Sequence, residues 1–503
     1  GEILCIIGES GSGKSVTAST VMGLLSPAMR VASGSIQFQE HDLLALPEEA
    51  RRELRGKRLA MIFQDPLSAL NPLMTVGAQI DETLVAHGFR DPAKRAERVL
   101  HLIREVGLPD PELLQHQYPF RLSGGQRQRI MIAIALALDP DLLIADEPTT
   151  ALDVTTQAQI LELIRRIQRE KGMSIMFITH DFGVVADIAD RVIVMEKGEL
   201  VEQGPAEKVL KTPDHPYTQR LLDAVPHLRE VDAAPETEAP VLLQVEKLEK
   251  TFRTTGGLWG RSRTVHAVND VGFALRRGKT LGVVGESGSG KSSMGKVLMR
   301  LTEADSGRIL FDDSDILAMT EAEFYPYRRR IQMIFQDPYA SLNPRQTIGR
   351  SLIVGPIAHS QKPAEAREKA HAILSQVGLD PSAFDRYPHE FSGGQRQRIG
   401  IARALMCDPE LIIADEAVSA LDVSIQAQVL ELLAQVQQER HLAMIFITHD
   451  LRVASQICDE VIVMHRGRVV EAGPPARIFR NPQEEYTRQL VAAIPGVSWE
   501  NAA

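Results

Sequence analysis

Short apolar runs that end in a polar motif recur along this chain. Residues 4–7 precede a glycine-rich stretch, residues 142–145 and 411–414 end in Asp-Glu, and residues 173–178 and 442–447 lead into Thr-His-Asp. Apolar runs of this length, in which Ser174 is the one polar residue, are typical of strands that are buried on both faces of a parallel sheet. We therefore predict buried parallel strands with a polar motif at the end of each.

The chain contains two copies of one domain. Four stretches recur in the same order: GESGSGKS at 8–15 and 285–292, MIFQDP at 61–66 and 333–338, SGGQRQRI at 123–130 and 392–399, and FITHD at 177–181 and 446–450. Two large copies indicate a duplicated domain and not a solenoid of short repeats. We predict a first domain over 1–228, a linker over 229–240 and a second domain over 241–503.

The predicted linker, REVDAAPETEAP, is rich in Ala, Pro and Glu and has no apolar periodicity, which is typical of an extended connection. Fully stretched it would span about 40 Å at roughly 3.3–3.6 Å per residue, enough for the copies to turn toward each other. Gly1 aligns with Gly278, so we expect the counterpart of roughly residues 242–277 to be missing ahead of the first copy. A targeting signal cannot be judged from such a start.

Composition narrows the class of protein. A length of 503 residues predicts about two to four domains, and 24% charged with 44% hydrophobic residues is the balance of a globular protein. The net charge of -10 gives no support for a broad nucleic-acid surface. The three cysteines form no CxxC pattern, so we expect buried thiols in a reducing compartment. The longest apolar run, residues 130–138, is far shorter than the roughly 20 residues that span a bilayer.

The glycine-rich stretch has the Walker A pattern, with a strand before it and a helix after it. Glycines let backbone N–H groups surround phosphate oxygens, the lysine reaches the β and γ phosphates, and the serine hydroxyl takes a Mg²⁺ position. A flexible glycine turn with a chance lysine is the alternative, which the repeat disfavours. The predicted residues are Gly8, Glu9, Ser10, Gly11, Ser12, Gly13, Lys14, Ser15 and Val16, with Gly285, Glu286, Ser287, Gly288, Ser289, Gly290, Lys291, Ser292 and Ser293.

Paired carboxylates follow the strands at 142–145 and 411–414. We predict that Asp146 and Asp415 hold Mg²⁺ through water and that Glu147 and Glu416 polarise the attacking water. Such a pair could instead cap a helix or lie in a solvated turn, but a P-loop upstream favours the catalytic interpretation.

Once LSGGQ at 122–126 and FSGGQ at 391–395 are added, the chain resembles the ATP-binding subunits of ABC transporters. The resemblance covers nearly the whole chain. It implies an α/β fold of tandem P-loop NTPase domains, each with a RecA-like core, an antiparallel β subdomain and an inserted helical subdomain. The helical subdomains would span roughly 66–121 and 338–390.

The resemblance also implies the remaining site residues. In this family two domains pair head to tail, so Lys14 would share an ATP with Ser392 and Gly394, and Lys291 with Ser123 and Gly125. Gln64 and Gln336 would contact Mg²⁺ and the catalytic centre, and His180 and His449 the γ-phosphate, although a lone His at a strand end is often a core residue. The other nucleotide-binding residues implied are Gly124, Gln126, Gly393, Gln395, Asp153, Asp422 and Phe252, the last as the adenine-stacking aromatic or else a strand-edge core residue.

Two further stretches resemble the dipeptide, oligopeptide and nickel importer group. FQDPLSALNP and FQDPYASLNP follow the glutamines, and HPYTQRLLDAVP closes the first copy at 215–226. The second copy has EEYTRQLVAAIP at 484–495, without His-Pro. Members of this group are peripheral proteins on the cytoplasmic face of the bacterial inner membrane. They act with two integral-membrane permeases and an extracytoplasmic solute-binding protein, and they bind no nucleic acid.

The alternative is a tandem ABC ATPase without a transport function, of the translation-factor or DNA-repair type. Those proteins have a long charged helical linker or cysteine-rich insertions, and neither is seen here. The basic runs at 51–58 and 328–330 are interpreted as solvated faces and not as nucleic-acid contacts. The resemblance implies that other chains select the transported solute.

The two copies differ beside the catalytic glutamates. Pro148 disfavours the right-handed helical conformation at Glu147, whereas Ala417 removes that restraint from Glu416. We predict two active but unequal sites, with the glutamate held more loosely in the second.

Overall fold

The computed structural model describes residues 1–150, 152–228, 239–254, 263–337, 341–419 and 421–497. The chain divides into two compact units, Gly1–Val225 with the residues from Ala493 onward, and Pro226–Ala492. The division after Val225 lies near the predicted end of the first domain, whose boundaries stay predictions. Most of the predicted linker, 229–238, lies outside the described residues.

The first unit is built on a six-stranded sheet of order β4-β5-β6-β1-β7-β8. Its neighbours are parallel except for β8, which runs antiparallel to β7 at the edge. The strands are β1 (Ile3–Ile7), β2 (Gln37–Phe38), β3 (His41–Asp42), β4 (Leu59–Ile62), β5 (Leu142–Asp146), β6 (Ser174–Ile178), β7 (Arg191–Glu196) and β8 (Glu199–Pro205). The runs predicted as buried strands at 4–7, 142–145 and 173–178 are β1, β5 and β6.

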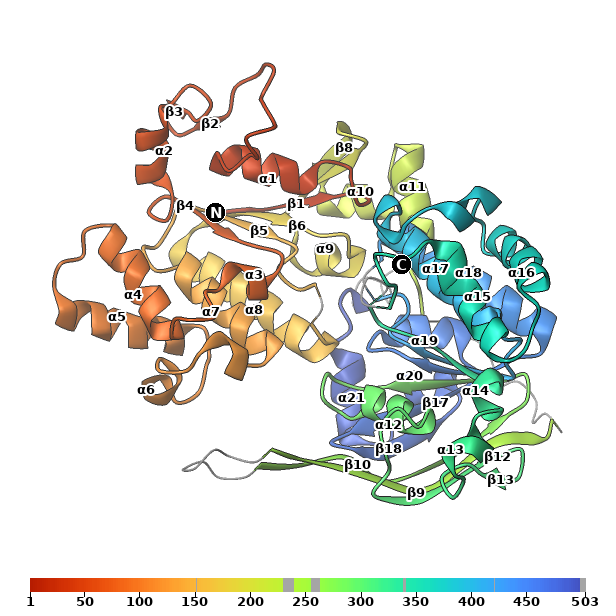
Figure 1. The fold of residues 1–503 in the computed structure, drawn as a ribbon. Coiled ribbons are helices and arrows are strands. Elements are labelled where there is room, and N and C mark those ends of the chain that lie inside the picture. Colours follow the sequence, from red (N-terminus) through yellow and green to blue (C-terminus); the bar gives the residue numbers. More distant parts are fainter. Residues whose placement is uncertain (151, 229–238, 255–262, 338–340, 420, 498–503) are drawn as a thin grey trace. The chain divides into compact units, whose positions relative to one another are not determined.

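Helices cover both faces of this sheet, with α1 on one face and α7 and α8 on the other (Figure 1). The helices are α1 (Lys14–Met22), α2 (Glu48–Leu54), α3 (Pro66–Ala69), α4 (Val76–Ala86), α5 (Pro92–Glu105), α6 (Pro111–Leu114), the 3₁₀ helix η1 (Pro119–Arg121), α7 (Gly124–Ala135), α8 (Val154–Lys171), α9 (Phe182–Ile188), α10 (Ala206–Lys211) and α11 (Pro216–Asp223). The stretch from α3 to η1 is helical, as the resemblance implies for an inserted subdomain.

The second unit repeats this sheet in the order β14-β15-β16-β11-β17-β18. Its strands are β9 (Val241–Thr254), β10 (Arg263–Arg276), β11 (Thr280–Val284), β12 (Ser306–Phe311), β13 (Ser314–Asp315), β14 (Ile331–Ile334), β15 (Leu411–Asp415), β16 (Ala443–Ile447), β17 (Glu460–His465) and β18 (Arg468–Gly473). Its helices are α12 (Lys291–Leu298), α13 (Glu321–Phe324), α14 (Tyr327–Arg330), α15 (Ile348–Ala358), α16 (Pro363–Gln376), η2 (Pro381–Asp385), η3 (Pro388–Glu390), α17 (Gly393–Leu405), α18 (Val423–Arg440), α19 (Leu451–Ile457), α20 (Pro475–Arg480) and α21 (Glu485–Ala492).

Alternation along the strands explains why both sheet faces are covered. On β15, Ile413 packs with Met294 of α12, whereas its neighbour Ile412 packs with Ile401 of α17 and Leu433 of α18. Successive side chains of a strand point to opposite faces, so a run that is apolar at every position needs a helix on each side. The core therefore consists of two apolar layers, one on each face of the sheet.

The antiparallel β subdomain differs between the units. In the second unit it is a four-stranded sheet of order β10-β9-β12-β13. Among the described residues of the first unit it is reduced to the β2–β3 pair. Both β9 and β10 lie before Gly278, the residue that aligns with Gly1, and β2 pairs with β3 among the described residues of the first unit.

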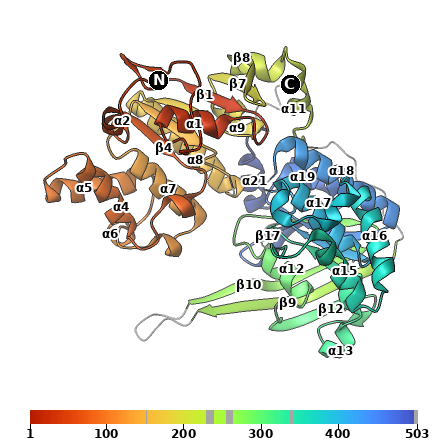
Figure 2. The ribbon, with the colours of Figure 1, turned by 45° about the horizontal axis from the view of Figure 1, so that its top comes forward.

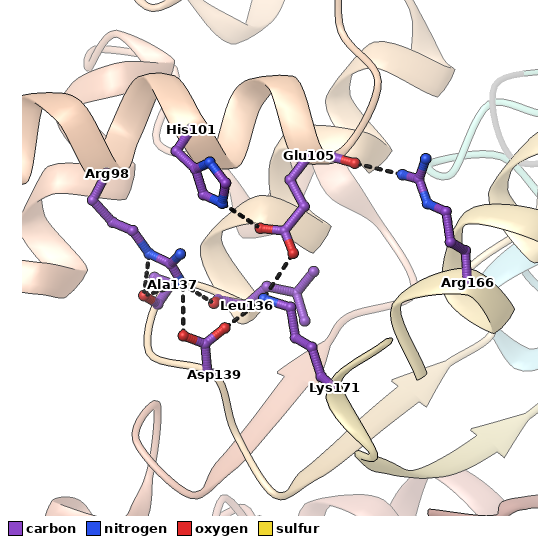
Figure 3. A network of polar contacts seen from close by, with 8 residues as sticks. All are labelled: Arg98, His101, Glu105, Leu136, Ala137, Asp139, Arg166 and Lys171. Carbon is purple, nitrogen blue, oxygen red and sulfur yellow. Dashed lines mark hydrogen bonds and ion pairs between the residues drawn. The ribbon is translucent and has the colours of Figure 1, made fainter. Parts of the chain in front are cut away.

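A polar network ties the helical insert of the first unit to its core (Figure 3). Asp139, in the turn before β5, forms ion pairs with Arg98 of α5 at 2.9 Å and with Lys171 at the end of α8. Lys171 also contacts Glu105 at 2.7 Å. In the second unit Asp408 has three cationic partners, Lys369, Arg440 and Arg329.

The basic runs are not simply solvated. Arg55 donates to the main-chain oxygens of Met22 at 2.7 Å and Gly23 at 3.2 Å, at the end of α1, and also binds Glu48. Arg330 binds Glu410 and, at 2.9 Å, Asp312. The prediction of solvated faces is wrong for these two side chains, because each neutralises or caps groups of the fold.

Two smaller expectations can be compared with the structure. Cys5 and Cys407 are buried free thiols as predicted, but Cys458 is only partly buried by the atoms around it. Within the described part of the chain, we find no helix with the length and apolar character needed to cross a membrane.

Candidate functional site

The P-loop follows β1 and begins at a glycine for a steric reason. Gly8 has φ 149°, and a Cβ there would lie 2.2 Å from the main-chain oxygen of Met195 on β7. Gly285 has φ 148° and would meet Met464 in the same way. The first glycine of each loop is therefore required by the close approach of the neighbouring strand.

The P-loop lysines lie inside their own loops. Lys14 is 5% exposed, and its Nζ donates to the main-chain oxygens of Gly8 at 2.7 Å and Glu9 at 2.8 Å. Lys291 makes the same pair of bonds to Gly285 at 2.6 Å and Glu286 at 2.8 Å. A buried ammonium group held at the mouth of a glycine loop is well placed to bind phosphate oxygens.

The serine that ends each P-loop contacts the first carboxylate of the Asp-Glu pair. Ser15 Oγ donates to Asp146 Oδ1 at 3.0 Å, and Ser292 Oγ to Asp415 Oδ1 at 2.9 Å. Burial raises the pKa of Asp146 above its ordinary value, and repulsion from Glu147 adds to this, while the Ser15 hydrogen bond opposes it. The pKa of Asp415 is raised by burial in the same way.

A hydroxyl and a carboxylate at this spacing form an oxygen donor set that fits Mg²⁺. Within the described ranges, no cluster of three or more His, Cys, Asp or Glu side chains forms a dedicated metal cage. Mg²⁺ bound with a nucleotide needs only one or two carboxylates from the protein, because phosphate oxygens and water supply the other ligands. Ser15 with Asp146, and Ser292 with Asp415, therefore fit the predicted metal role.

Glu147, the predicted catalytic glutamate of the first unit, lies where three strands of the sheet end. Glu147 accepts a hydrogen bond from Gln64 Nε2 at 3.0 Å and lies 3.3 Å from His180 Nδ1. These three residues follow β5, β4 and β6, which are neighbours in the sheet. Parallel strands end at the same edge, so residues more than 80 positions apart in the sequence meet here.

The second unit brings the equivalent residues together. Glu416 accepts from Gln336 Nε2 at 2.7 Å and lies 3.6 Å from His449 Nδ1. The glutamate side chains are 14% and 16% exposed, so both are largely shielded from bulk water.

The pKa of each of these two glutamates is lowered from its ordinary value. Burial alone would raise the pKa of Glu147, but the hydrogen bond and charge of His180, helped by Thr150 and Lys14, outweigh it. Burial alone would also raise the pKa of Glu416, but the hydrogen bond and charge of His449, helped by the charge of Lys291, outweigh it. Both carboxylates are therefore held ionised, the state in which a general base can accept a proton.

The signature residues begin helices α7 and α17. Ser123 Oγ accepts from the main-chain N–H of Gln126 at 3.3 Å, and the Gln126 side chain accepts from Ser123 N at 3.0 Å. Ser392 and Gln395 form the same reciprocal cap. Gly124 and Gly125 follow the cap Ser123 as the first two residues of α7, and Gly393 and Gly394 follow Ser392 in the same way at the start of α17. Pairing of each signature with the other unit's lysine stays a prediction.

The second signature glycine has a packing role as well. A Cβ at Gly125 would lie 2.4 Å from Thr156 Cγ2, and one at Gly394 would lie 2.5 Å from Ile425 Cγ2. Larger residues would therefore push α7 and α17 away from the helices that follow.

Two other predicted nucleotide-binding residues have structural surroundings of their own. Asp153 is the N-cap of α8, and its carboxylate accepts from Thr156 N at 2.9 Å. Asp422 precedes α18 without a side-chain cap bond. Phe252, on β9, is 44% exposed with Lys250 over its ring at 5.6 Å, so the alternative of a core residue is wrong.

Two contacts were not foreseen. Thr150 Oγ1 donates to Glu147 Oε2 at 3.0 Å, and Tyr217, in the HPY stretch, contacts the P-loop of its unit. The sequence signal for Thr150 was its position beside the Asp-Glu pair. Tyr217 lies in a recognisable motif, but Glu9 is 208 positions away in the sequence, so no local pattern predicts the contact between them.

Comparisons with known proteins agree with this site. The ABC transporter family profile matches residues 1–150 and 268–419, and the profile of the oligopeptide/dipeptide transporter C-terminal region matches 201–254 and 470–502. The chain is 49% identical over 499 residues to the peptidoglycan transport ATP-binding protein YejF of Agrobacterium fabrum, covering 98% of this chain and 90% of that protein.

Two further relatives are named for glutathione. The glutathione import ATP-binding protein GsiA is 46% identical in Salmonella paratyphi A and 47% identical in Escherichia coli O157:H7, in each case covering 98% of this chain and 85% of the relative. With both P-loops, both signatures and both Asp-Glu pairs in place, the chain belongs to the ABC transporter family of ATP-binding proteins and contains two ATPase copies.

Proposed function

We propose that this chain hydrolyses ATP to drive the import of a peptide or a peptide-like solute through separate membrane proteins. The proposal rests on one observation, the assembly of the same glutamine, glutamate and histidine at the end of the P-loop sheet in both units. The import direction and the peptide class are supported by the names of the relatives and by the C-terminal profile.

Each residue has a chemical role in this proposal. Glu147 and Glu416 accept a proton from the attacking water, and the histidines and glutamines orient these carboxylates. Lys14 and Lys291 bind phosphate oxygens, and the Ser15–Asp146 and Ser292–Asp415 pairs would hold Mg²⁺, which would supply charge neutralisation of the phosphates. Phe252 would stack on adenine at the second site. Asp153 and Asp422 would contact the nucleotide through the turn before α8 and α18.

The two units are proposed to pair head to tail. Lys14 would then share one ATP with Ser392 and Gly394, and Lys291 the other with Ser123 and Gly125. Each charge-assisted hydrogen bond contributes about 1.5–3 kcal/mol, so several per nucleotide are enough to bias a closed pair that hydrolysis releases.

The partners follow from the same proposal. Two integral-membrane permeases would dock near Gln64 and Gln336, and an extracytoplasmic binding protein would select the solute. The chain would then lie peripherally on the cytoplasmic face of the bacterial inner membrane.

A double variant tests the catalytic assignment. Glu147→Gln with Glu416→Gln should lower steady-state ATP hydrolysis about 10²- to 10⁴-fold while ATP binding persists, because the amide cannot accept the proton. Glu207→Gln is the matched control, since its carboxylate is 80% exposed on α10 and its ion pair is with Lys211 of the same helix. Unchanged turnover in the double variant would refute the assignment.

Purification from membranes tests the importer assignment. Recovery of two multispanning proteins with the tagged chain is the expected result. Recovery of ribosomes or DNA-repair proteins in their place would support the alternative of a tandem ATPase without a transport function.

A further inference from the structure

In each unit a tyrosine after the last strand contacts the backbone of the P-loop. Tyr217 Oη accepts from the main-chain N–H of Glu9 at 3.2 Å, and Tyr486 Oη accepts from that of Glu286 at 3.1 Å. Tyr217 is 3% exposed, so its hydroxyl lies within the protein and not in bulk water. The same contact forms twice, between residues 208 and 200 positions apart.

Each tyrosine segment is anchored to the edge strand by a buried carboxylate. Glu202 of β8 accepts from the main-chain N–H groups of Asp214 at 2.8 Å and His215 at 3.2 Å. Figure 2 shows α11, which begins directly after His215, beside β7 and β8. Two charge-assisted bonds fix the start of the helix that bears Tyr217.

The second unit repeats this anchor with different residues around it. Glu471 of β18 accepts from Gln483 N at 2.9 Å and from Glu484 N at 3.2 Å. Tyr486 stacks on the ring of His465 at 3.9 Å, whereas Tyr217 packs under Arg220 at 5.8 Å. The His-Pro pair and the covering side chain change between the units, while the carboxylate anchor and the tyrosine hydroxyl remain.

The residue that the tyrosine contacts also faces the P-loop lysine. The main-chain oxygen of Glu9 accepts from Lys14 Nζ at 2.8 Å, and that of Glu286 from Lys291 Nζ at 2.8 Å. Each glutamate is thus held by its N–H on one side and by its carbonyl oxygen on the other. A shift of this residue would move the carbonyl that orients the lysine.

We infer that Tyr217 and Tyr486 are positioning residues of the two ATP sites, which hold the start of each P-loop in its phosphate-binding shape. This inference rests on the ATP site proposed above. It gives the segment after β8 and β18 a role in nucleotide affinity, in addition to any contact it makes with other proteins. Neither tyrosine touches the reacting atoms, so neither is a catalytic residue.

The test is the double variant Tyr217→Phe with Tyr486→Phe in the full chain, which removes two hydroxyl groups and keeps both rings. The KM for ATP and the dissociation constant of a fluorescent ATP analogue should rise about 2- to 10-fold, the effect of one lost neutral hydrogen bond per site. The kcat should change less than about 2-fold, because the catalytic glutamates are untouched.

Tyr325→Phe is the matched control. Its hydroxyl donates to the main-chain oxygen of Ala358 at 2.8 Å, so the variant loses one bond between a tyrosine hydroxyl and the main chain, here donated and not accepted, outside the P-loop. The control should leave KM unchanged. A double variant with unchanged KM, or one that loses kcat alone, would overturn the inference, as would an equal rise of KM in the control.

A further pair of variants separates this inference from the proposed function. Lys14→Ala with Lys291→Ala should abolish binding of the ATP analogue. If binding persists, the ATP site itself is misassigned. If binding is lost while the tyrosine variant retains the wild-type affinity, the ATP site stands and only the positioning role is refuted.

Discussion

At the end of β5 the hydroxyl of Thr150 donates to the side chain of Glu147, whereas at the end of β15 the equivalent hydroxyl, on Ser419, donates to the main-chain oxygen of Glu416 at 3.1 Å. The distance from glutamate to histidine is 3.3 Å in the first unit and 3.6 Å in the second. By contrast, the distance from the glutamine nitrogen to the glutamate oxygen is longer in the first unit, 3.0 Å, than in the second, 2.7 Å. Among the described residues, the Thr150 hydroxyl gives Glu147 a side-chain hydrogen bond that the equivalent Ser419 does not give Glu416, while the bond from glutamine is the shorter one in the second unit.

The backbone does not differ as the sequence suggested. Glu147 has φ 46° and Glu416 has φ 47°, although only Glu147 precedes a proline. The N–H of each glutamate donates at 2.9 Å to the last residue of the neighbouring strand, Ile178 or Ile447. This bond is the same in both units, so replacing Pro148 with Ala417 leaves the left-handed conformation in place. The predicted difference in backbone restraint is not found, and the difference between the sites lies in the side-chain contacts.

Single glutamate variants should give the largest effect and test whether the two sites are unequal. Glu147→Gln and Glu416→Gln should each lower hydrolysis at the affected site about 10²- to 10⁴-fold. Because Glu147 has the additional bond from Thr150, we expect the chain to retain more turnover when Glu416 is changed than when Glu147 is changed. Steady-state phosphate release checks this, and equal residual rates would contradict the asymmetry.

Removing the hydroxyl groups should separate the sites more directly. Thr150→Ala should lower turnover about 2- to 10-fold, because Glu147 loses a hydrogen bond to its charged carboxylate. Ser419→Ala should have a smaller effect, since the bond that its hydroxyl forms with Glu416 goes to the main-chain oxygen and not to the carboxylate. Thr150→Ser is the control that keeps the hydroxyl, and it should restore most of the rate. If both alanine variants behave alike, the side-chain contact of Thr150 is unimportant.

The histidines offer a pH test of the second site. Burial would lower the pKa of His449, but the hydrogen bond and charge of Glu416 outweigh it and raise the pKa above its ordinary value of 6.5. The stabilisation from this pair is therefore fully present below pH 6.5 and is lost as the pH rises through the raised pKa. NMR titration should show a lower pKa for His449 in Glu416→Gln. An unchanged titration would mean that Glu416 does not cause the shift.

How far the sequence predicts this molecule depends on how local each feature is. The strand–glycine loop–helix order around Lys14 and the apolar strand before Asp146 are local patterns, and the structure contains both. The convergence of Gln64, Glu147 and His180 was accessible only through the family resemblance, because it depends on the order of strands in the sheet.

Other features were not accessible from the sequence. Thr150 and Ser419 bear the same hydroxyl chemistry, and only the side-chain rotamer decides whether it reaches the carboxylate or the main chain. The contact from Tyr217 to Glu9 needs the packing of α11 against the sheet, which no short motif encodes. Arg55 and Arg330 lie in basic runs that are typical of solvated faces, yet Arg55 also binds the end of α1 and Arg330 binds Glu410, 80 residues away.

The smallest expected effect concerns the two aspartates that tie each helical insert to its core. Asp139 has two cationic partners and Asp408 has three, and the Asp139 pairs appear in Figure 3. Both aspartates have positive φ, 52° and 48°, a conformation that Asn also accepts readily, so Asp→Asn removes the charge and leaves the backbone unstrained.

Both aspartate side chains are more than half exposed, so solvent screening limits each ion pair to about 0–1 kcal/mol. Asp139→Asn and Asp408→Asn should therefore each lower the free energy of unfolding by about 1 kcal/mol or less, with the larger loss for Asp408→Asn because it leaves three cations facing one another. Urea denaturation at low and high salt measures both losses, and high salt should shrink them. A larger loss for Asp139→Asn would contradict this order. It would mean that the ion pair of Asp139 with Lys171, which also contacts Glu105, stabilises the fold more than the three ion pairs of Asp408 do.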